Sequence, residues 1–382
     1  MKSVAILLSA DSFEKFFGGF FGITAEDYVE RYRNDFAWYY AAALSKRGHR
    51  VSIYVLSRER EFARPTPDGL AVRFLRLPRW WLLLDPLLYR LARRGLLARL
   101  RARIEAAAFG PALRAGLEAD RIDVLYVQEI WPDRIDFLRP PKGVELIGAD
   151  HGAPARTPGP AKRRALRRLK KITVQERGQQ QQIEAAGARA ILIPNGVETA
   201  FFTPPPSADA RAKSVLAIGR LDDRQKRLSD LISAMVELPD FRLDIVGAGP
   251  DQDRLMEQAG QLRLDGRVTF HGFVSDRERL RELYRACGVF CCPSAWEATL
   301  LVLLEAMSCG AACVSSDIPT LREVLADGSG LIVPVGNPSR LSAAIDEAYR
   351  RRAELGSAAR QRAVTQFDQQ ACMQRLSDYI ES

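Results

Sequence analysis

The hydrophobic positions of the chain form short apolar runs separated by longer segments of mixed polarity. Runs of this kind, bounded by glycine, proline or charged residues, are typical of strands buried on both faces. We expect strands at 4–8, 51–56, 123–128, 144–149, 172–174, 190–194, 214–218, 243–246, 268–273, 289–292, 312–315 and 330–334. Helical segments lie between them, for example at 31–47, which ends before Gly48. This alternation predicts an α/β protein with parallel, doubly wound sheets.

The chain length and one proline-rich segment indicate two domains. The protein has 382 residues, of which 47% are hydrophobic, and these values suit two globular domains. The sequence Pro-Pro-Pro-Ser at 204–207 predicts a stiff linker and places the boundary there. No apolar run approaches the length of a membrane-spanning helix, so none is expected.

The densest candidate chemistry lies in the segment 289–313, VFCCPSAWEATLLVLLEAMSCGAAC. Its pattern predicts a strand, a polar loop, a helix and a second strand. Ligands of parallel sheets bind at the carboxyl ends of strands, beside helix N-termini. Glu297 in the loop and Glu305 two turns along the helix would be separated by roughly 12 Å. A solvated loop glutamate and an ordinary helix glutamate remain the alternative, although an ionised Glu305 in this apolar run needs a partner.

The sequence PSAWEATLLVLLEAMSCG resembles the signature of retaining glycosyltransferases of family 4. This resemblance implies the GT-B fold, with two doubly wound Rossmann-like domains facing a central cleft. Residues 1–203 would then bind the acceptor and 208–365 the nucleotide-sugar donor, while a C-terminal helix at 366–382 would pack back on the first domain. One departure is Ala298-Thr299-Leu300, where the family often has Gly-Phe-Gly. Backbone N–H groups for phosphate remain there, without the flexibility of glycine.

The resemblance also assigns a donor site. Arg220 and Lys226 would hold the pyrophosphate, because fixed cations stabilise the charge that the leaving diphosphate gains. Glu297 would lie against the sugar and the phosphate edge, and Glu305 against the ribose. A surface charge is the alternative for the two cations. The donor contacts implied are Gly18, Gly19, Arg220, Lys226, Gly247, Phe273, Val274, Glu297, Ala298, Thr299, Leu300 and Glu305, with the nucleobase near Phe273 and Val274.

Two features of the first domain complete the expected site. Gly18 and Gly19 follow the first strand, where the resemblance implies close backbone approach to the donor phosphates or acceptor; a flexible loop is the alternative. His151 follows the strand at 144–149. The resemblance places such a histidine against the transferred sugar, and a structural histidine is the alternative. The expected catalytic residues are therefore Glu297, His151, Arg220 and Lys226.

The resemblance implies a glycosyltransferase of hexosyltransferase type that uses a UDP- or GDP-sugar and a saccharide or lipid-linked acceptor. We expect neither a cofactor nor a metal. Asp251 and Asp253 form a D-x-D pattern, but acids are common in the first turn of a helix, so we reject it as a metal site. One alternative is a nucleotide-sugar epimerase, which needs no acceptor. A non-catalytic basic protein is another, although no nucleic-acid-binding signature is present.

Composition bears on the location of the enzyme. The net charge is +9, and the six cysteines lack paired zinc-ligand spacing, which favours reduced structural thiols in the cytoplasm. The segment 77–109 combines Trp80, Trp81 and three leucines with arginines, and a second basic helix is expected at 162–170. Leu96, Leu97, Leu100 and Ile104 share one helical face. These patterns predict peripheral binding to the inner, anionic membrane surface; internal packing is the alternative.

Overall fold

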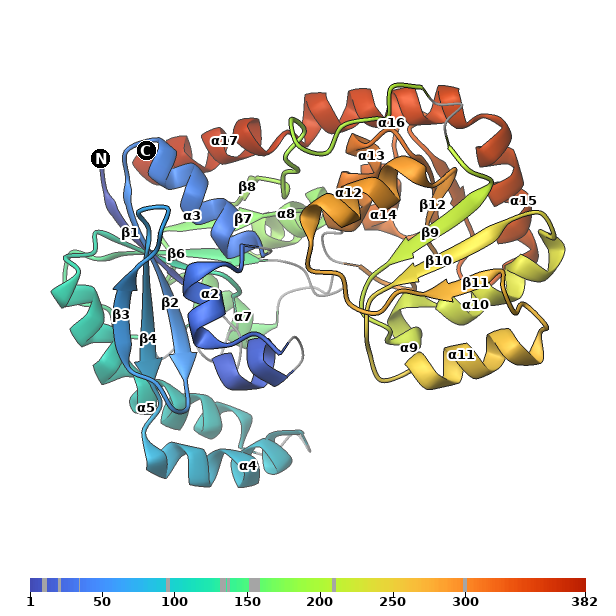
Figure 1. The fold of residues 1–382 in the computed structure, drawn as a ribbon. Coiled ribbons are helices and arrows are strands. Elements are labelled where there is room, and N and C mark those ends of the chain that lie inside the picture. Colours follow the sequence, from blue (N-terminus) through green and yellow to red (C-terminus); the bar gives the residue numbers. More distant parts are fainter. Residues whose placement is uncertain are drawn as a thin grey trace. The chain divides into compact units, whose positions relative to one another are not determined.

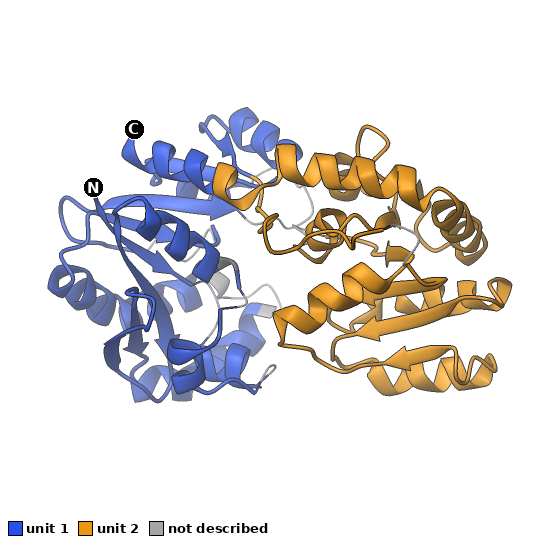
Figure 2. Ribbon diagram, turned by 45° about the horizontal axis from the view of Figure 1, so that its top comes forward, with its two compact units in different colours: residues 1–193, 373–382 blue, residues 194–372 orange. Residues whose placement is uncertain are grey.

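The computed structural model describes residues 1–8, 12–19, 22–33, 35–93, 97–130, 135, 138–150, 159–207, 211–297 and 301–382. The chain forms two compact units (Figures 1 and 2). Unit 1 comprises Met1–Ile193 together with Met373–Ser382, and unit 2 comprises Pro194–Cys372. The second unit thus begins ahead of the proline-rich segment at 204–207.

Unit 1 is built on one sheet of eight strands. Their order is β3-β4-β2-β1-β5-β6-β7-β8, and all neighbours are parallel except β3 and β4. The strands are β1 (Ser3–Leu7), β2 (Arg50–Ser57), β3 (Phe62–Pro65), β4 (Ala71–Arg76), β5 (Val124–Val127), β6 (Glu145–Asp150), β7 (Lys171–Val174) and β8 (Ile191–Leu192). The central strand β1 is fully buried, which explains its continuous apolar run.

The helices of unit 1 differ in several places from the expectation. They are η1 (Glu14–Gly18), α2 (Ala25–Glu30), α3 (Phe36–Lys46), α4 (Arg79–Arg93), α5 (Ala98–Ala119), α7 (Pro160–Leu166), α8 (Arg177–Ala185) and, from Met373 onward, α17 (Gln369–Glu381). The helix expected at 31–47 starts later, because the Asp35 carboxylate accepts from Ala37 N at 2.8 Å and caps α3. The basic helix expected at 162–170 ends at Leu166, since β7 begins at Lys171.

Unit 2 contains a sheet of six parallel strands in the order β11-β10-β9-β12-β13-β14. They are β9 (Ser214–Ile218), β10 (Arg242–Val246), β11 (Val268–Phe270), β12 (Val289–Cys292), β13 (Ala312–Ser316) and β14 (Leu331–Val333). The helices are α9 (Asp223–Lys226), α10 (Leu228–Ala234), η3 (Met235–Glu237), α11 (Gln252–Gln261), α12 (Arg277–Ala286), α13 (Leu301–Ser308), α14 (Pro319–Val324), α15 (Pro338–Arg350) and α16 (Arg352–Gln366). The predicted strands at 214–218 and 289–292 are confirmed.

Both sheets reverse their strand order once, and this reversal locates the expected ligand sites. In unit 2 the order runs outward in opposite directions from β9 and β12, and in unit 1 from β1 and β5. Loops that leave two such neighbouring strands diverge to opposite sides and leave a crevice at their carboxyl ends. In unit 2, these loops contain Lys226 after β9 and Glu297 after β12.

The helix α17 closes one side of unit 1. The Lys2 ammonium donates to the Ile380 carbonyl at 2.6 Å, and the buried His49 ring bonds through Nε2 to the Ser377 hydroxyl at 2.9 Å. His49 Nδ1 accepts from Lys2 N at 3.2 Å. His49, directly before β2, is therefore a structural link to the last helix.

Two general expectations concern the core and the membrane. All six cysteines are free and buried, in agreement with structural thiols. Within the part of the chain that the structure describes, the helices are too short or too polar to traverse a bilayer.

Candidate active site

The loops after β9 and β10 approach each other so closely that glycine is required. Gly247 has φ +136°, and a Cβ there would lie 1.9 Å from the Gly219 carbonyl oxygen. A Cβ on Gly249 would lie 2.5 Å from the Leu221 carbonyl oxygen. Backbone bonds join the loops, with Leu221 N donating to Ala248 O at 3.0 Å. Gly247 therefore fixes the path of the loop that carries the cations, while its contact with the donor stays a prediction.

Lys226 and Glu297 form the central ion pair of this edge. Lys226 Nζ lies 2.6 Å from Glu297 Oε1, and their side chains are only 14% and 5% exposed. The two loops are joined nearby by a bond from Ala295 N to the Gln225 carbonyl at 2.8 Å. Thr320 Oγ1 donates to the Glu297 carbonyl at 3.1 Å and fixes the backbone of this glutamate. The structure thus brings together two of the predicted site residues, which are 71 positions apart in the sequence.

Arg220 lies at the same edge but is more exposed. Its side chain is 53% exposed, and its guanidinium donates to Asp222 Oδ2 at 3.0 Å. This contact neutralises the cation only from one side and leaves its outer face to solvent. An exposed guanidinium beside a half-buried ammonium suits an anion that carries more than one negative charge.

The acidic residues of the D-x-D pattern have structural partners. Asp251 Oδ2 accepts from Asp223 N at 2.8 Å, and Asp251 Oδ1 lies 3.5 Å from Arg254 Nε. Asp253 lies in the first turn of α11, where its charge favours the helix dipole. Among the described residues, no group of three or more potential ligands is arranged to hold a metal ion.

Glu305 is buried on α13 and has a specific partner on α12. Tyr284 donates its hydroxyl hydrogen to Glu305 Oε2 at 2.7 Å. Burial raises the pKa of Glu305 to about 7, while the Tyr284 hydrogen bond and the Arg277 charge act in the opposite direction. The partner that the apolar run required is therefore Tyr284, which the sequence analysis missed because it lies 21 residues away on another helix.

Phe273 and Val274 follow β11 at the carboxyl edge of the sheet. Gly247 N donates to the Gly272 carbonyl at 2.8 Å, so this segment lies directly beside the loop after β10. Phe273 is 44% exposed, whereas Val274 packs against the apolar cluster that contains Tyr284. An exposed aromatic ring at this edge offers a stacking surface.

Two family descriptions match adjoining parts of the chain. Residues 35–201 match Glycosyltransferase Family 4, and residues 199–364 match Glycosyl transferases group 1. The chain belongs to the family 4 and group 1 glycosyltransferases. The predicted donor-site residues described so far all lie in the group 1 region.

Relatives of this glycosyltransferase support the same fold. It is 39% identical over 184 residues to phosphatidyl-myo-inositol mannosyltransferase from Mycolicibacterium smegmatis, covering 46% of this chain and 47% of that protein. The chain spans about half the length of the curated relatives it matches. Sucrose-phosphate synthase from Thermosynechococcus elongatus has a TM-score of 0.75 at 19% identity, covering 100% and 98% of the two chains. The structure of Anabaena HepE with UDP and glucose has a TM-score of 0.69 at 18% identity, with 100% of both chains covered. The fold is GT-B.

The remaining predicted residues of the glycosyltransferase are less constrained. His151, Ala298, Thr299 and Leu300 lie outside the described residues. Gly18 ends the π-helical segment η1, and neither it nor Gly19 has a positive φ. Their Cβ positions would be 4.0 Å and 3.4 Å from the nearest heavy atoms outside the adjoining residues. Unlike Gly247, these glycines are not required by the observed backbone, and their donor contacts stay predictions.

The helix α4 has one buried and one exposed apolar side. Trp80, Leu83, Leu84 and Leu87 are 46%, 81%, 43% and 57% exposed. Their spacing of i, i+3, i+4 and i+7 places them on one face. Trp81 belongs to the core of unit 1 and is only 3% exposed, so its predicted contact with a membrane is wrong. The period of the helix turns adjacent tryptophans to different sides.

The start of α5 also departs from the predicted face. Leu97 and Leu100 are 48% and 44% exposed, whereas Ile104 packs against the core of unit 1. Arg101 points inward to Asp85, with its Nη2 2.6 Å from Oδ1. The apolar side chains expected on one face are therefore divided between solvent and the core. Leu96 lies outside the described residues.

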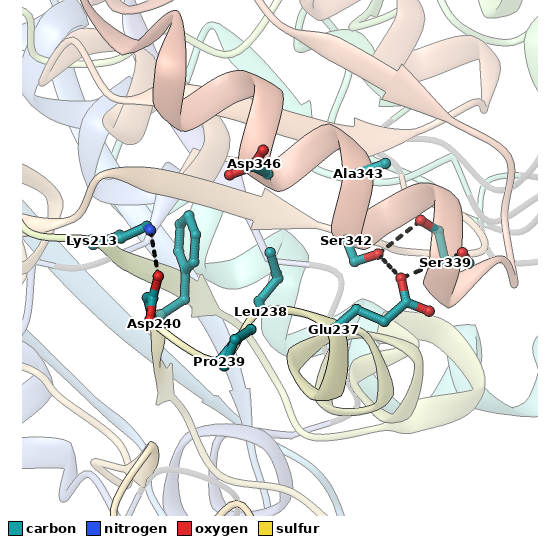
Figure 3. A pocket seen from close by; sticks show the side chains of 10 residues that line it. Lys213, Glu237, Leu238, Pro239, Asp240, Ser339, Ser342, Ala343 and Asp346 are labelled. Carbon is teal, nitrogen blue, oxygen red and sulfur yellow. Dashed lines mark hydrogen bonds and ion pairs between the residues drawn. The ribbon is translucent and has the colours of Figure 1, made fainter.

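A pocket of about 340 Å³ in unit 2 is separate from the predicted donor site (Figure 3). Lys213 and Asp240 line it just before β9 and β10 begin, and they form an ion pair of 3.0 Å. On its other side the Ser342 hydroxyl donates to Glu237 Oε2 at 2.5 Å. Because the strands are parallel, this pocket lies at the amino edge of the sheet, opposite Lys226 and Glu297.

Proposed function

We propose that this protein transfers a sugar from a nucleoside diphosphate sugar to an acceptor with retention of configuration and without a metal ion. The observation that carries the proposal is the ion pair between Lys226 and Glu297 at the point where the strand order of unit 2 reverses. A half-buried ammonium, positioned by a carboxylate, is a preorganised site for a diphosphate. The UDP bound by Anabaena HepE is consistent with this ligand class.

In this proposal the bond between the sugar C1 and the diphosphate oxygen breaks, and its electron pair stays on the diphosphate. Lys226 and Arg220 stabilise the charge that develops there. The acceptor hydroxyl attacks C1 from the face that the diphosphate leaves, and its proton passes to the departing phosphate oxygen. This route retains configuration without a protein nucleophile.

Within the same proposal, Glu305 holds the ribose and Glu297 the region where sugar and phosphate meet. The Tyr284 hydroxyl donates to Oε2 of Glu305. We expect a ribose hydroxyl to donate to the other carboxyl oxygen. Phe273 offers its exposed ring beside the nucleobase. Along the carboxyl edge, the cations follow β9, the two glutamates follow β12, and Phe273 follows β11.

We further propose that the acceptor is linked to a lipid at an anionic membrane surface. The exposed apolar face of α4 supports this, because Arg79 and Arg90 are exposed near its two ends. The name of the mannosyltransferase from Mycolicibacterium smegmatis also states a lipid acceptor. Peripheral association with the cytoplasmic face follows from this acceptor.

The experiment compares Lys226→Ala with Arg224→Ala, since both remove a cation from α9 and Arg224 is 87% exposed. Calorimetry with UDP and GDP should show an affinity loss of about tenfold to a hundredfold for Lys226→Ala alone, as expected when a charge-assisted hydrogen bond is lost. Equal affinities of the two variants would contradict the proposal.

The products distinguish transfer from epimerisation. Incubation of the enzyme with a nucleotide sugar and acceptor lipids should give a glycolipid. NMR of this product should show that the transferred sugar has the same anomeric configuration as in the donor. Conversion of the nucleotide sugar to its epimer without an acceptor would instead favour the alternative of an epimerase.

A further inference from the structure

A separate pocket of about 240 Å³ lies within unit 1, between α4 and the ends of three strands. Ser12 and Lys15 reach it after β1, Arg58 after β2 and Leu77 after β4. In Figure 1, α4 and α5 lie side by side below this sheet. The pocket is therefore at the carboxyl edge of the unit 1 sheet, where α/β folds bind ligands, and it shares no residue with the donor site of unit 2.

One wall of the pocket is positively charged. Arg58 is exposed, and its guanidinium has no ion-pair partner among the residues that the structure describes. Glu14 accepts from the Ser57 hydroxyl and, at 2.8 Å, from Arg58 N, which holds η1 against the end of β2. This clamp brings Lys15, the next residue of η1, to the same pocket as Arg58.

Ser12 supplies an observation independent of charge. Ser12 lines the pocket and is 3% exposed, and its Oγ has no hydrogen-bond partner among the residues that the structure describes. Buried hydroxyls are almost always hydrogen-bonded, because an unmet hydrogen bond in a buried place is unfavourable. A ligand with acceptor oxygens would satisfy this hydroxyl.

The opposite wall comes from α4 and α5. Arg101 ion-pairs with Asp85 and lies 5.7 Å from the Trp81 ring centre and 5.5 Å from that of Tyr89. Glu105 is a second acid in this wall. The pocket thus has three cations and two acids, a combination that suits an anion bearing hydroxyl groups. Its volume is below the roughly 300–1,000 Å³ usual for larger ligands, which favours a head group over a nucleotide sugar.

We propose that this pocket binds the phosphate-bearing head group of the lipid acceptor, with the lipid chains against the exposed face of α4. The inference rests on the proposed transfer to a lipid. One side of α4 lines the pocket through Trp81 and Tyr89, while Leu83 and Leu87 project from another side. A head group in the pocket and apolar chains along the helix would use both sides at once.

The test compares Arg58→Gln with Arg60→Gln, since both remove one exposed positive charge but Arg60 does not line the pocket. Calorimetry with glycerol 3-phosphate should show at least about tenfold weaker binding for Arg58→Gln and no change for Arg60→Gln. Ser12→Ala should also weaken binding, while its unfolding temperature stays at or above that of the wild type, because it removes an unsatisfied hydroxyl. Glycerol, without phosphate, should bind none of these proteins.

A second arm identifies the source of the phosphate. Sedimentation with phosphatidylglycerol vesicles should weaken more for Arg58→Gln than for Arg60→Gln, although both lose the same charge. Equal effects in both arms would overturn the pocket. Arg58→Gln could lose glycerol 3-phosphate binding and yet sediment with vesicles like Arg60→Gln. This result would overturn the proposal of a lipid and indicate a soluble phosphate compound as the ligand.

The variant Lys226→Ala separates this inference from the proposed donor site. It should bind glycerol 3-phosphate like the wild type, because Lys226 lies in unit 2. If only this variant loses binding, the phosphate occupies the donor site and the pocket in unit 1 is excluded. If UDP and GDP affinities are insensitive to Lys226 while glycerol 3-phosphate binding still depends on Arg58, the donor-site proposal fails and the pocket stands.

Discussion

The two units share a reversal of strand order but differ in the segments that leave their central strands. After β9 in unit 2, a short loop is held by close backbone contacts at Gly247 and leads to the buried pair of Lys226 and Glu297. After β1 in unit 1, the chain enters η1, which packs through aromatic side chains; the ring centres of Phe13 and Phe17 are 5.5 Å apart. One edge is shaped by backbone, the other by side chains.

This difference matches the ligands we propose for each unit. A diphosphate has a fixed shape and charge, so a rigid loop that tolerates few substitutions is suited to bind it. Acceptor head groups differ in structure from one acceptor to another. Unit 1 contains the β3–β4 hairpin and the α4–α5 pair in addition to its parallel strands, and in our proposal α4 and α5 contribute to the acceptor site. The same kind of sheet thus supports one constrained site and one adaptable site.

The largest expected effect comes from replacing one glycine in each unit, Gly247 and Gly18, by alanine. Gly247→Ala should lower the free energy of unfolding of unit 2 by about 3 kcal/mol or more, because its Cβ would overlap the Gly219 carbonyl at a strained φ. Gly18→Ala should change stability by less than about 1 kcal/mol, since the nearest atoms are 4.0 Å from its Cβ. Denaturant unfolding followed by circular dichroism measures both. Similar losses would contradict the contrast.

Buried carboxyl groups give a second comparison, in which the change in unfolding free energy with pH is roughly 3 kcal/mol. The folded-state pKa of Glu305 is raised from 4.5 to about 7, so its contribution is fully present below pH 4.5 and is lost as the pH rises through 7. The unfolding free energy of the wild type should therefore fall over this range relative to Glu305→Gln. In unit 1, burial raises the Asp35 pKa from 3.8 to about 6, so the corresponding loss is smaller and ends at lower pH.

A pH series of denaturant unfolding for the wild type and the two glutamine or asparagine variants, Glu305→Gln and Asp35→Asn, measures these losses. A constant difference between wild type and Glu305→Gln from pH 4.5 to 8 would show that Glu305 stays ionised in the folded protein.

Membrane binding should depend on unit 1 alone. Leu83→Ser with Leu87→Ser should weaken sedimentation with anionic vesicles by about tenfold or more, since each leucine that enters the lipid contributes roughly 1.5–3 kcal/mol when fully buried. Diphosphate affinity and stability should not change, because both leucines are exposed. Binding should also weaken with salt.

The exposed Val236 of unit 2 provides a control, since Val236→Ser should leave vesicle binding unchanged. Wild-type protein that stays in the supernatant with anionic vesicles at low salt would contradict the membrane proposal. Trp81→Ser is unsuitable as a probe, because it would disrupt the core.

The smallest expected effect is that of chelation. Activity should be unchanged in saturating EDTA, because cations of unit 2 supply the charge that a metal would otherwise provide. Asp251 is already bonded to Asp223 N and lies near Arg254. Loss of activity that magnesium or manganese restores would contradict this prediction and return Asp251 and Asp253 to consideration as ligands.

The sequence predicted unit 2 more closely than unit 1, for a physical reason. Buried parallel strands are continuous apolar runs, and β9 and β12 were located to the residue. The motifs singled out Lys226 and Glu297 separately, but they did not predict the ion pair between them. In unit 1, the edge strand β3 was missed because most of its residues are exposed, and its neighbour β4 was missed because its residues differ in burial and form no continuous apolar run.

Contacts between distant residues could not be read from periodicity. Tyr284 and Glu305 lie on different helices, and Ser12 and Arg58 line the same pocket only because β1 and β2 are neighbours in the sheet. The helical pattern of 77–109 indicated an amphipathic segment, yet it did not show that Arg101 points inward to Asp85. Which face is buried depends on the elements that cover it.

The helix α17 makes unit 1 discontinuous in sequence, with consequences for biosynthesis. Residues 1–193 leave the ribosome first, all of unit 2 follows, and only then does the segment 373–382 become available. Until that moment the His49 ring, the Lys2 ammonium and the Lys171 ammonium lack their contacts with Ser377 and Ile380. The contacts that complete unit 1 can therefore form only after unit 2 has been synthesised.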